Sequence, residues 1–270
     1  MKVLVTGSNG FIGKNLIPAL PKDWKVDTFD IYDTPIDGII ARPHQLNIQN
    51  YNWVIHLGAL SSTTETDVNY VMDLNLMWSI ELAELCSKYG VNLQWSSSAS
   101  VYGSARLLPM REDDLCDPKN LYAMSKFLFE QYITHRLRCG VYQGFRYFNV
   151  YGPHEQHKGS QASPYTQFAK QAKETGVIKV FEGSENYLRD FVHVDTVVDY
   201  HIKMMTSSHP VSGIFNIGSG TPRSFLDVAR DVALLYDAKI ETIPFPPHLI
   251  GHYQKYTCAD MSKIRRVLEI

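Results

Sequence analysis

Tyr122 and Lys126 are a pair whose residue types and spacing could carry out chemistry. They stand four residues apart in Tyr-Ala-Met-Ser-Lys, so a helix there would place both side chains on one face. A free tyrosine has a pKa of about 10 and is a poor base at neutral pH. A neighbouring ammonium would lower that pKa and let Tyr122 take the proton of a substrate hydroxyl. In a chain with 16 tyrosines, an exposed pair formed by chance is the alternative.

A serine cluster strengthens the catalytic interpretation. Ser96, Ser97 and Ser98 follow Trp95 at the end of a segment that we predict to be a buried parallel strand. Ligands of α/β sheets bind at the carboxyl ends of such strands. We therefore expect Ser98 to hydrogen-bond the same substrate oxygen as Tyr122.

A glycine-rich loop, Thr6-Gly-Ser-Asn-Gly-Phe-Ile-Gly13, lies between an apolar run and a stretch with helical spacing of apolar residues. Gly7 permits a tight turn, Gly10 lets the backbone approach phosphates, and Gly13 lets helix and strand pack closely. The N-terminus of the helix would then offer N–H groups and partial positive charge to a pyrophosphate. The loop predicts a nicotinamide dinucleotide site, where a bound cofactor would accept a hydride.

A phosphate-binding loop for ATP or GTP is the rival interpretation. Ser8 stands where that loop requires its first glycine, and Asn15 replaces its magnesium-binding Ser or Thr. Asp30, which ends the second predicted strand, supports the dinucleotide instead. A carboxylate there accepts from a ribose 2′-hydroxyl and repels a 2′-phosphate, which favours NAD. The alternative role for Asp30 is a capping or turn aspartate.

Composition and charge bound the function classes. The 270 residues are 44% hydrophobic and carry a formal net charge of −2, so no global field attracts nucleic acid or an anionic membrane. No apolar run spans a bilayer or resembles a signal peptide, which predicts a cytoplasmic protein. Four scattered cysteines predict free thiols, and His154 and His157 without further ligands predict no metal site.

Strands alternating with helices predict a Rossmann-type α/β fold with a doubly wound parallel sheet. Expected strands are 2–6, 25–29, 53–57, 91–96 and 144–150, and expected helices begin at Phe11 and cover 73–89 and 122–136. The rhythm changes after Tyr151, with a helix at 165–175, strands at 178–181 and 214–217, and a helix at 224–236. We predict a dinucleotide-binding domain over 1–150 and a smaller, mainly substrate-binding α/β part over 151–270, whose strands can return to the main sheet.

The glycine loop, the serine cluster and Tyr-x-x-x-Lys together resemble the extended short-chain dehydrogenase/reductase superfamily, within its NAD-dependent epimerase/dehydratase family. Later segments narrow the resemblance over nearly the whole chain. In combination and order, the segments at 144–153, 157–160, 181–186, 189–192 and 243–246 resemble the ADP-glyceromanno-heptose 6-epimerases.

The resemblance implies inversion of C6 in a nucleotide-linked manno-heptose, through a 6-ketone that regains its hydride on the opposite face. It implies Tyr122 on one side of that carbon and Lys158 on the other, although a solvated surface lysine is the alternative for Lys158. It also implies ADP-heptose as substrate, a homo-oligomer and NADP. The stretch between Asp30 and Trp53 has no lysine, and Arg42 is its only arginine, which favours NAD. We take NADP as the expected cofactor and NAD as the alternative.

The resemblance, the loop and Asp30 together define the expected contact residues. Those at the cofactor are Gly7, Gly10, Phe11, Ile12, Gly13, Asp30, Ile31, Leu57, Gly58, Ala59, Ser61, Asn75, Tyr122, Lys126, Val150 and Lys158. Those at the substrate are Ser61, Ser98, Asn149, Ser160, Gln167, Phe181, Glu182, Gly183, Ser184, Arg189 and Tyr253.

Arg189 and Gln167 bear on how the substrate would be held. The guanidinium fork of Arg189 suits a diphosphate, with a surface ion pair to Asp190 or Glu185 as its alternative. Gln167 stands where the family commonly has a histidine, so contacts to the sugar can differ.

Three other functions stay open. A related nucleotide-sugar 4-epimerase or reductase would use the same Ser, Tyr and Lys set. A 4,6-dehydratase is disfavoured, because that chemistry wants an Asp-Glu pair where Ala99 and Ser100 follow Ser98. A non-catalytic dinucleotide sensor could share the fold, since a fold does not dictate function.

Overall fold

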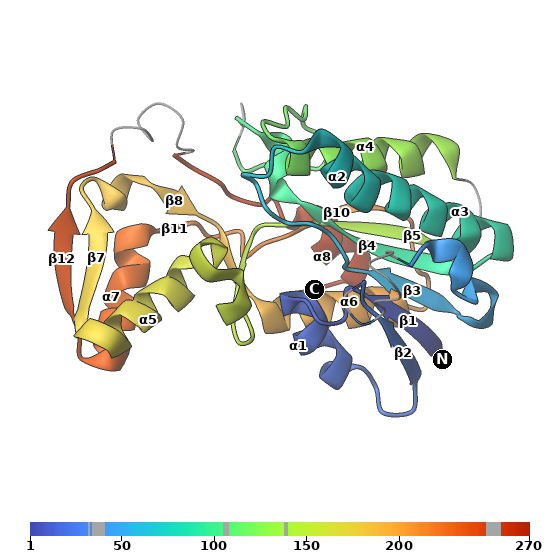
Figure 1. The fold of residues 1–270 in the computed structure, drawn as a ribbon, viewed down its shortest axis with the longest axis horizontal. Coiled ribbons are helices and arrows are strands. Elements are labelled where there is room, and N and C mark those ends of the chain that lie inside the picture. Colours follow the sequence, from blue (N-terminus) through green and yellow to red (C-terminus); the bar gives the residue numbers. More distant parts are fainter. Residues whose placement is uncertain (32, 34–40, 105–107, 138–139, 247–254) are drawn as a thin grey trace.

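A six-stranded parallel sheet forms the centre of the computed structural model, which describes residues 1–31, 33, 41–104, 108–137, 140–246 and 255–270 (Figure 1). The strand order is β10-β5-β4-β3-β1-β2, and every neighbouring pair is parallel. The strands are β1 Lys2–Thr6, β2 Lys25–Phe29, β3 Trp53–His56, β4 Asn92–Ser98, β5 Tyr142–Tyr147 and β10 Gly213–Ile217. The predicted Rossmann-type α/β fold is therefore confirmed.

Helices cover both faces of this sheet (Figure 1). One face carries α1 (Phe11–Ala19) and α6 (Val194–Thr206), and the other carries α2 (Val68–Val71), α3 (Trp78–Tyr89) and α4 (Leu121–Arg136). The alternation along β1 decides which side chain enters which layer: Val3 and Val5 pack with the α1 and α6 face, whereas Leu4 packs with the α3 and α4 face. Both faces of the inner strands are buried, as is usual in parallel sheets, whereas the edge strand β2 is largely exposed.

A smaller lobe lies beside the carboxyl edge of the sheet (Figure 1). Its helices α5 (Pro164–Thr175) and α7 (Phe225–Tyr236) share a core with the parallel pair β7 (Val177–Phe181) and β12 (Lys239–Ile243). Two short ladders connect the lobe to the sheet: β6 (Asn149–Tyr151) with β9 (Phe191–His193), and β8 (Leu188–Arg189) with β11 (Arg223–Ser224). The last described helix is α8, Ser262–Leu268.

The structure departs from the predicted elements at several positions. The strand expected at 144–150 ends at Tyr147, because Asn149–Tyr151 leaves the sheet to pair with β9. The helix expected at 73–89 begins at Val68 and contains a π-helical turn at Met72–Met77. Sequence reasoning assigned no element to α6, α8 or β12, nor to the short strands β8, β9 and β11. The strand expected at 214–217 returns to the main sheet as β10, beside β5.

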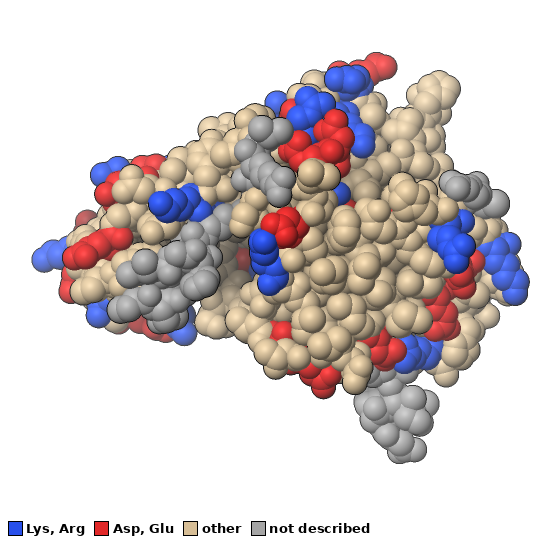
Figure 2. Space-filling view, turned by 90° about the horizontal axis from the view of Figure 1, so that it is seen from above, with Lys and Arg blue, Asp and Glu red and all other residues tan. Residues whose placement is uncertain are grey.

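Surface features bear on the predicted function classes. Acidic and basic side chains are interspersed on the face seen from above, without a large area of one sign (Figure 2). Among the helices within the described ranges, none has the length and hydropathy needed to cross a bilayer.

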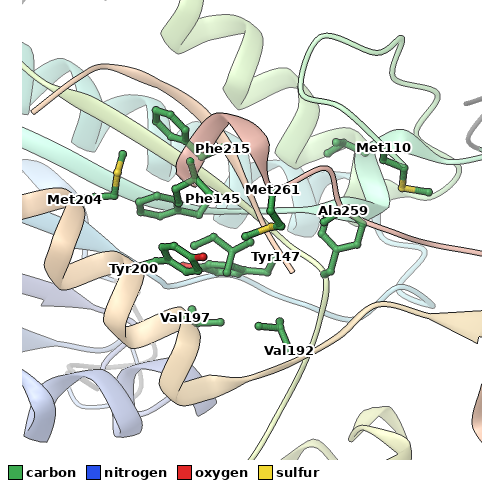
Figure 3. Close-up of a cluster of buried hydrophobic side chains, with 14 of the residues drawn as sticks. Met110, Phe145, Tyr147, Val192, Val197, Tyr200, Met204, Phe215, Ala259 and Met261 are labelled. Atoms are coloured by element: carbon green, nitrogen blue, oxygen red, sulfur yellow. The ribbon is translucent and has the colours of Figure 1, made fainter. Parts of the chain in front are cut away.

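A buried polar chain holds α6 against the sheet. Gln94 Oε1 accepts from His201 Nδ1 at 2.6 Å, which leaves His201 Nε2 to accept from the Tyr147 hydroxyl at 2.6 Å. Gln94 Nε2 donates in turn to Gln143 Oε1 at 2.8 Å. Around it lies the apolar cluster of Figure 3, in which β5, β10, α6 and the chain near Met261 meet.

One buried ion pair ties α4 to β5. Arg146 donates to both carboxylate oxygens of Glu130, at 3.0 and 2.7 Å, and Ser97 Oγ donates to Glu130 Oε1 at 2.5 Å. The two charged side chains are 3% and 0% exposed, so each depends on the other for its countercharge.

We predict that Arg146→Met lowers the free energy of unfolding by about 3–5 kcal/mol, because it leaves the buried Glu130 carboxylate without the cation that is hydrogen-bonded to it. Urea denaturation at pH 7 measures the change. The matched control is Arg230→Met, whose guanidinium is 63% exposed beside Asp227 and should change stability by less than about 1 kcal/mol. Equal effects of the two substitutions would contradict the prediction.

Candidate active site

The glycine loop forms a tight cradle at the carboxyl end of β1. Gly7 has φ +73°, and a Cβ placed on it would lie 2.3 Å from Gly58 N. A Cβ on Gly13 would lie 2.6 Å from Gly7 O, inside the packing of α1 against the strand. Gly10 precedes α1, and no side chain caps that helix, so its N-terminal N–H groups face the loop. These residues fit a dinucleotide pyrophosphate, which a helix N-terminus binds well.

The end of β2 is acidic. Asp30 is buried, and its Oδ2 accepts from Asn9 N at 3.0 Å. Asn9 Nδ2 donates to Asp33 Oδ1 at 2.8 Å. Arg42, the only arginine between Asp30 and Trp53 in the sequence, donates to both carboxylate oxygens of Asp73, at 2.8 and 2.7 Å. The structure therefore brings a carboxylate to the glycine loop and holds the Arg42 guanidinium in an ion pair with another carboxylate.

Asn75 lies in the π-helical turn and connects two parts of the site. Its Oδ1 accepts from Leu60 N at 2.8 Å, and its Nδ2 donates to Leu60 O at 3.0 Å and to Ser125 Oγ at 3.2 Å. The predicted cofactor contacts Leu57, Gly58, Ala59 and Ser61 belong to the loop that this amide fixes. Asn75, itself expected at the cofactor, thus positions both that loop and α4. A π-turn that aims one side chain in this way is common at functional sites.

A buried histidine continues this network to the glycine loop. Ser79 Oγ donates to Asn75 O at 2.6 Å, so it accepts from His56 Nε2 at 2.8 Å, and His56 Nδ1 accepts from Thr6 Oγ1 at 2.7 Å. Burial lowers the pKa of His56 to about 3, and the nearby charge of Lys126 acts in the same direction. The imidazole is therefore neutral and joins β1, β3 and α3.

Ser98, Tyr122 and Lys126 come together as predicted. Asn120 caps α4 by accepting from Ala123 N at 2.8 Å, which starts the helix one residue before Tyr122. Lys126 follows one turn later, with Nζ 5.9 Å from the centre of the Tyr122 ring. Tyr122 is hydrogen-bonded with Ser98, at the end of β4, and Lys126 Nζ donates to Ser96 Oγ at 3.3 Å.

Burial shifts the pKa values of Tyr122 and Lys126, and the sequence alone did not predict these shifts. Burial raises the pKa of the Tyr122 phenol, and the hydrogen bond with Ser98 opposes it. Burial lowers the pKa of the Lys126 ammonium to about 8, against the attraction of Glu130. We expected Lys126 to lower the Tyr122 pKa, but in the protein alone this pKa is raised. Desolvation of the buried phenolate is the largest effect, and Lys126 is not among the described groups that shift the Tyr122 pKa.

Lys158 lies beside the glycine loop rather than on open surface. It belongs to the 3₁₀ segment Gln156–Gln161, and its Nζ lies 5.1 Å from the centre of the Phe11 ring at the start of α1. Asn15 Nδ2 donates to Pro153 O at 2.9 Å, and Gln161 Nε2 to Ser62 Oγ at 3.4 Å. The connection from β6 to α5 therefore reaches both α1 and the loop after β3. The Lys158 side chain is only 27% exposed.

The predicted substrate residues lie mostly in the smaller lobe and its connections. Asn149 is exposed on β6, and Ser160 and Gln167 are joined by a bond of 3.1 Å from Gln167 Nε2 to Ser160 O. Phe181 ends β7 at 37% exposure, and Glu182, Gly183 and Ser184 form the turn that follows.

Arg189 is buried, with its guanidinium over the Phe225 ring at 5.6 Å, so it is not the surface residue of the alternative interpretation. Ile12 and Val150, expected at the cofactor, are partly buried against the apolar layer between the sheet and α1 and α6. Ile31 is partly buried against the layer on the opposite face, under α3 and α4. Tyr253 lies outside the described residues. Within the described ranges, no three His, Cys, Asp or Glu side chains gather as metal ligands.

Two carboxylates at this site escaped sequence reasoning. Glu130 follows Lys126 by four residues on α4 and raises the Lys126 pKa, so the 122, 126, 130 spacing was an available signal. Glu155 is fully buried and contacts Lys158, for which the sequence offered no signal beyond nearness along the chain.

We predict that the free energy of unfolding of the wild type rises with pH relative to Lys126→Met between about pH 8 and 10. The folded protein releases the Lys126 proton near pH 8, whereas the unfolded chain holds it to 10.5, so the unfolded state binds more protons in this window. The difference should grow by at most about 1.4 kcal/mol per pH unit. Urea denaturation at several pH values measures it, and parallel curves for the two proteins would contradict it.

Known proteins share this architecture. ADP-L-glycero-D-manno-heptose-6-epimerase from Helicobacter pylori is 27% identical, with a TM-score of 0.85 over 99% of this chain and 90% of that chain. UDP-glucose 4-epimerase from Thermus thermophilus, solved with NAD, is 25% identical, with a TM-score of 0.81 over 98% and 92%. RMD from Pseudomonas aeruginosa, complexed with NADPH, shares the fold at 22% identity, with a TM-score of 0.77 over 99% and 92%.

The family described as the NAD dependent epimerase/dehydratase family matches residues 3–218. This match spans most of the chain, and it includes β1, the glycine loop, the serine cluster and α4. A nicotinamide dinucleotide as cofactor agrees with the cradle at Gly7 and Gly13. The chain belongs to the NAD dependent epimerase/dehydratase family, and the predicted enzyme class, a nicotinamide-dependent nucleotide-sugar epimerase, is confirmed.

Proposed function

We propose that this protein inverts C6 of a nucleotide-linked manno-heptose, converting ADP-D-glycero-D-manno-heptose into ADP-L-glycero-D-manno-heptose through a 6-keto intermediate. The proposal rests on one observation: two side chains that can transfer protons come from opposite faces of the sheet. Tyr122 comes from α4 on one face of the sheet, and Lys158 lies against Phe11 of α1 on the other face. Acid or base groups on two sides of one carbon suit its inversion, because one can take the proton before the ketone turns and the other can supply it afterwards. The similarity to the Helicobacter pylori enzyme supports the choice of substrate.

The residues divide the work as follows. Ser98 hydrogen-bonds the oxygen on C6, and Tyr122 accepts the hydroxyl proton as the alcohol becomes a ketone. The positive charge of an oxidised nicotinamide, when bound, would favour the phenolate that this step requires, against the burial that raises the Tyr122 pKa. The dinucleotide, when bound, would take a hydride from C6 and return it. After the ketone presents its opposite face, Lys158 supplies a proton to the C6 oxygen as the alcohol re-forms. Lys126 holds the site by its bond to Ser96 and would contact the nicotinamide ribose.

Substrate binding falls to the smaller lobe in this proposal. Phe181, the turn at 182–184 and Arg189 face the nucleotide diphosphate, and Asn149, Ser160 and Gln167 the sugar. Arg189 is buried and carries a fork of donors that suits a diphosphate. We keep the division into 1–150 and 151–270, and the homo-oligomer implied by the resemblance, as proposals of the same kind.

For the cofactor we propose NAD, although the resemblance to heptose epimerases implied NADP. The buried Asp30 carboxylate lies against Asn9 at the end of β2, where it would repel a 2′-phosphate. Arg42, the only arginine between Asp30 and Trp53 in the sequence, is engaged by Asp73 in two hydrogen bonds.

Within the epimerase class, a related 4-epimerase is the alternative enzyme, and the sequence had also left open a reductase. A 4-epimerase would act on C4 of a hexose nucleotide, and a reductase would consume reduced cofactor. A non-catalytic sensor gains no support from the structure, because Ser98, Tyr122 and Lys126 converge at one edge of the sheet.

We predict that wild-type protein interconverts the C6 epimers of ADP-heptose, and that Tyr122→Phe and Lys158→Met each lower turnover by about 100-fold or more. Each variant loses one of the two proton-transfer groups and should still bind the dinucleotide. NMR of the sugar signals follows the reaction, and fluorescence of bound NADH follows the cofactor. Failure of the wild type to interconvert the epimers, or near-normal turnover in either variant, would overturn the two-sided mechanism.

We further predict that the protein binds NADH at least about tenfold more tightly than NADPH, because like charges at Asp30 and the 2′-phosphate repel. Asp30→Ala should weaken NADH binding and reduce that preference. Fluorescence titration with both dinucleotides measures it. Asp23→Ala, which removes an exposed carboxylate elsewhere, serves as the control and should leave the ratio unchanged. Tighter binding of NADPH by the wild type would refute NAD as the natural cofactor.

A further inference from the structure

Glu155 is a fully buried carboxylate within the connection between β6 and α5. Three uncharged donors from the start of α5 reach it: Ser163 N at 2.9 Å, Ser163 Oγ at 2.6 Å and Thr166 Oγ1 at 2.7 Å. The N-terminus of a helix stabilises negative charge, which accounts for the position of this carboxylate.

The fourth donor is different in kind. Lys158 Nζ donates to Glu155 Oε1 at 3.2 Å, and this ammonium is the only countercharge that the hydrogen bonds and ion pairs of the described residues give Glu155. A buried charge needs a partner of opposite sign, and an ammonium on a flexible four-carbon chain needs an acceptor to keep one orientation. Each of the two side chains therefore limits where the other can go.

The contact also fixes the direction in which Lys158 points. Its Nζ lies 5.1 Å from the centre of the Phe11 ring, beside the glycine loop. The backbone of the same segment is held by Lys158 N donating to Glu155 O at 3.0 Å and by Asn15 Nδ2 donating to Pro153 O at 2.9 Å. Glu155 thus anchors both the segment and its lysine to α5 on one side, while Asn15 anchors the segment to α1 on the other.

We propose that Glu155 is the positioning residue for Lys158, holding its ammonium at the cofactor edge of the site where it transfers a proton to the substrate. The role of Lys158 rests on the proposed function, whereas its orientation by Glu155 does not. Glu155 itself touches neither substrate nor cofactor in this scheme. A displacement of a proton-transfer group by about 1 Å can lower a rate by about 100-fold, so loss of this contact should be measurable.

A double-mutant cycle of Glu155→Gln and Lys158→Met tests the proposal through epimerisation. Glutamine keeps the size and an acceptor oxygen but removes the charge, so Glu155→Gln alone should lower kcat by about 10- to 100-fold with little change in KM. In the Lys158→Met background the same substitution should have no further effect. Equal losses in both backgrounds would show a merely structural role and overturn the proposal.

The matched control is Glu174→Gln, which removes an exposed carboxylate 3.9 Å from Lys170 on α5. It makes the same acid-to-amide change at a surface ion pair and should leave kcat unchanged. A loss comparable to that of Glu155→Gln would show that the change in charge, rather than the contact with Lys158, is responsible.

A second measurement does not depend on the reaction. Limited acetylation followed by peptide mass spectrometry compares Lys158 with Lys170, whose side chain is 73% exposed. In the wild type Lys158 should react several-fold more slowly than Lys170, and Glu155→Gln should remove most of that protection. If Glu155→Gln does not fold, the wild-type comparison alone decides, because equal rates for the two lysines would overturn the positioning role.

The two arms separate the two claims. Protection of Lys158 by Glu155 together with normal epimerisation by Lys158→Met would refute the proposed role of the lysine and leave its positioning intact. If Lys158 is not protected but Lys158→Met inactivates the protein, the proposed role of the lysine would stand and its positioning by Glu155 would be refuted.

Discussion

Several polar side chains at the carboxyl edge of the central sheet are buried, and each must find its hydrogen-bond partner within the protein. This requirement determines how the loops and helices at that edge are placed. His56 binds Thr6 and Ser79, Ser79 binds the carbonyl of Asn75, and the Asn75 amide binds Leu60 and Ser125. One chain of hydrogen bonds thus connects the glycine loop, the loop after β3 and α4, so that the glycine loop and Tyr122 hold a fixed relation to each other.

Sterics act beside hydrogen bonding at the same edge. Gly7 and Gly58 approach so closely that a Cβ on Gly7 would overlap the Gly58 backbone, which brings the two loops together over the ends of β1 and β3. The strand order reverses between these two strands, and this is the point where open α/β sheets bind dinucleotides. The segment that matches the family model contains the glycine loop, the serine cluster and α4, which are the parts of the chain that meet at this edge.

The connection from β6 to α5 adds what the sheet alone lacks. Glu155 ties it to the smaller lobe and Asn15 ties it to α1, so Lys158 reaches the cofactor edge from the face opposite α4. Loops carry function when a rigid scaffold positions them, and here two elements from different lobes do so. The proposed two-sided chemistry depends on this arrangement more than on any single motif.

Local sequence was enough to predict the alternation of strands and helices, the glycine loop, and the pairing of Ser98, Tyr122 and Lys126. The elements and the Tyr122–Lys126 pair rest on periodicity and on spacing within one element, which backbone geometry converts directly into position. Ser98 was predicted to join them because ligands of α/β sheets bind at the carboxyl ends of the strands. Sequence reasoning missed α6, whose inner face includes the buried His201, and it extended β5 into β6, which pairs elsewhere. The pKa shifts of Tyr122 and Lys126, the pairing of Arg42 with Asp73, and the contact of Glu155 with Lys158 became evident only in the folded chain. Burial and partners distant along the chain set these properties, and neither is written in local spacing.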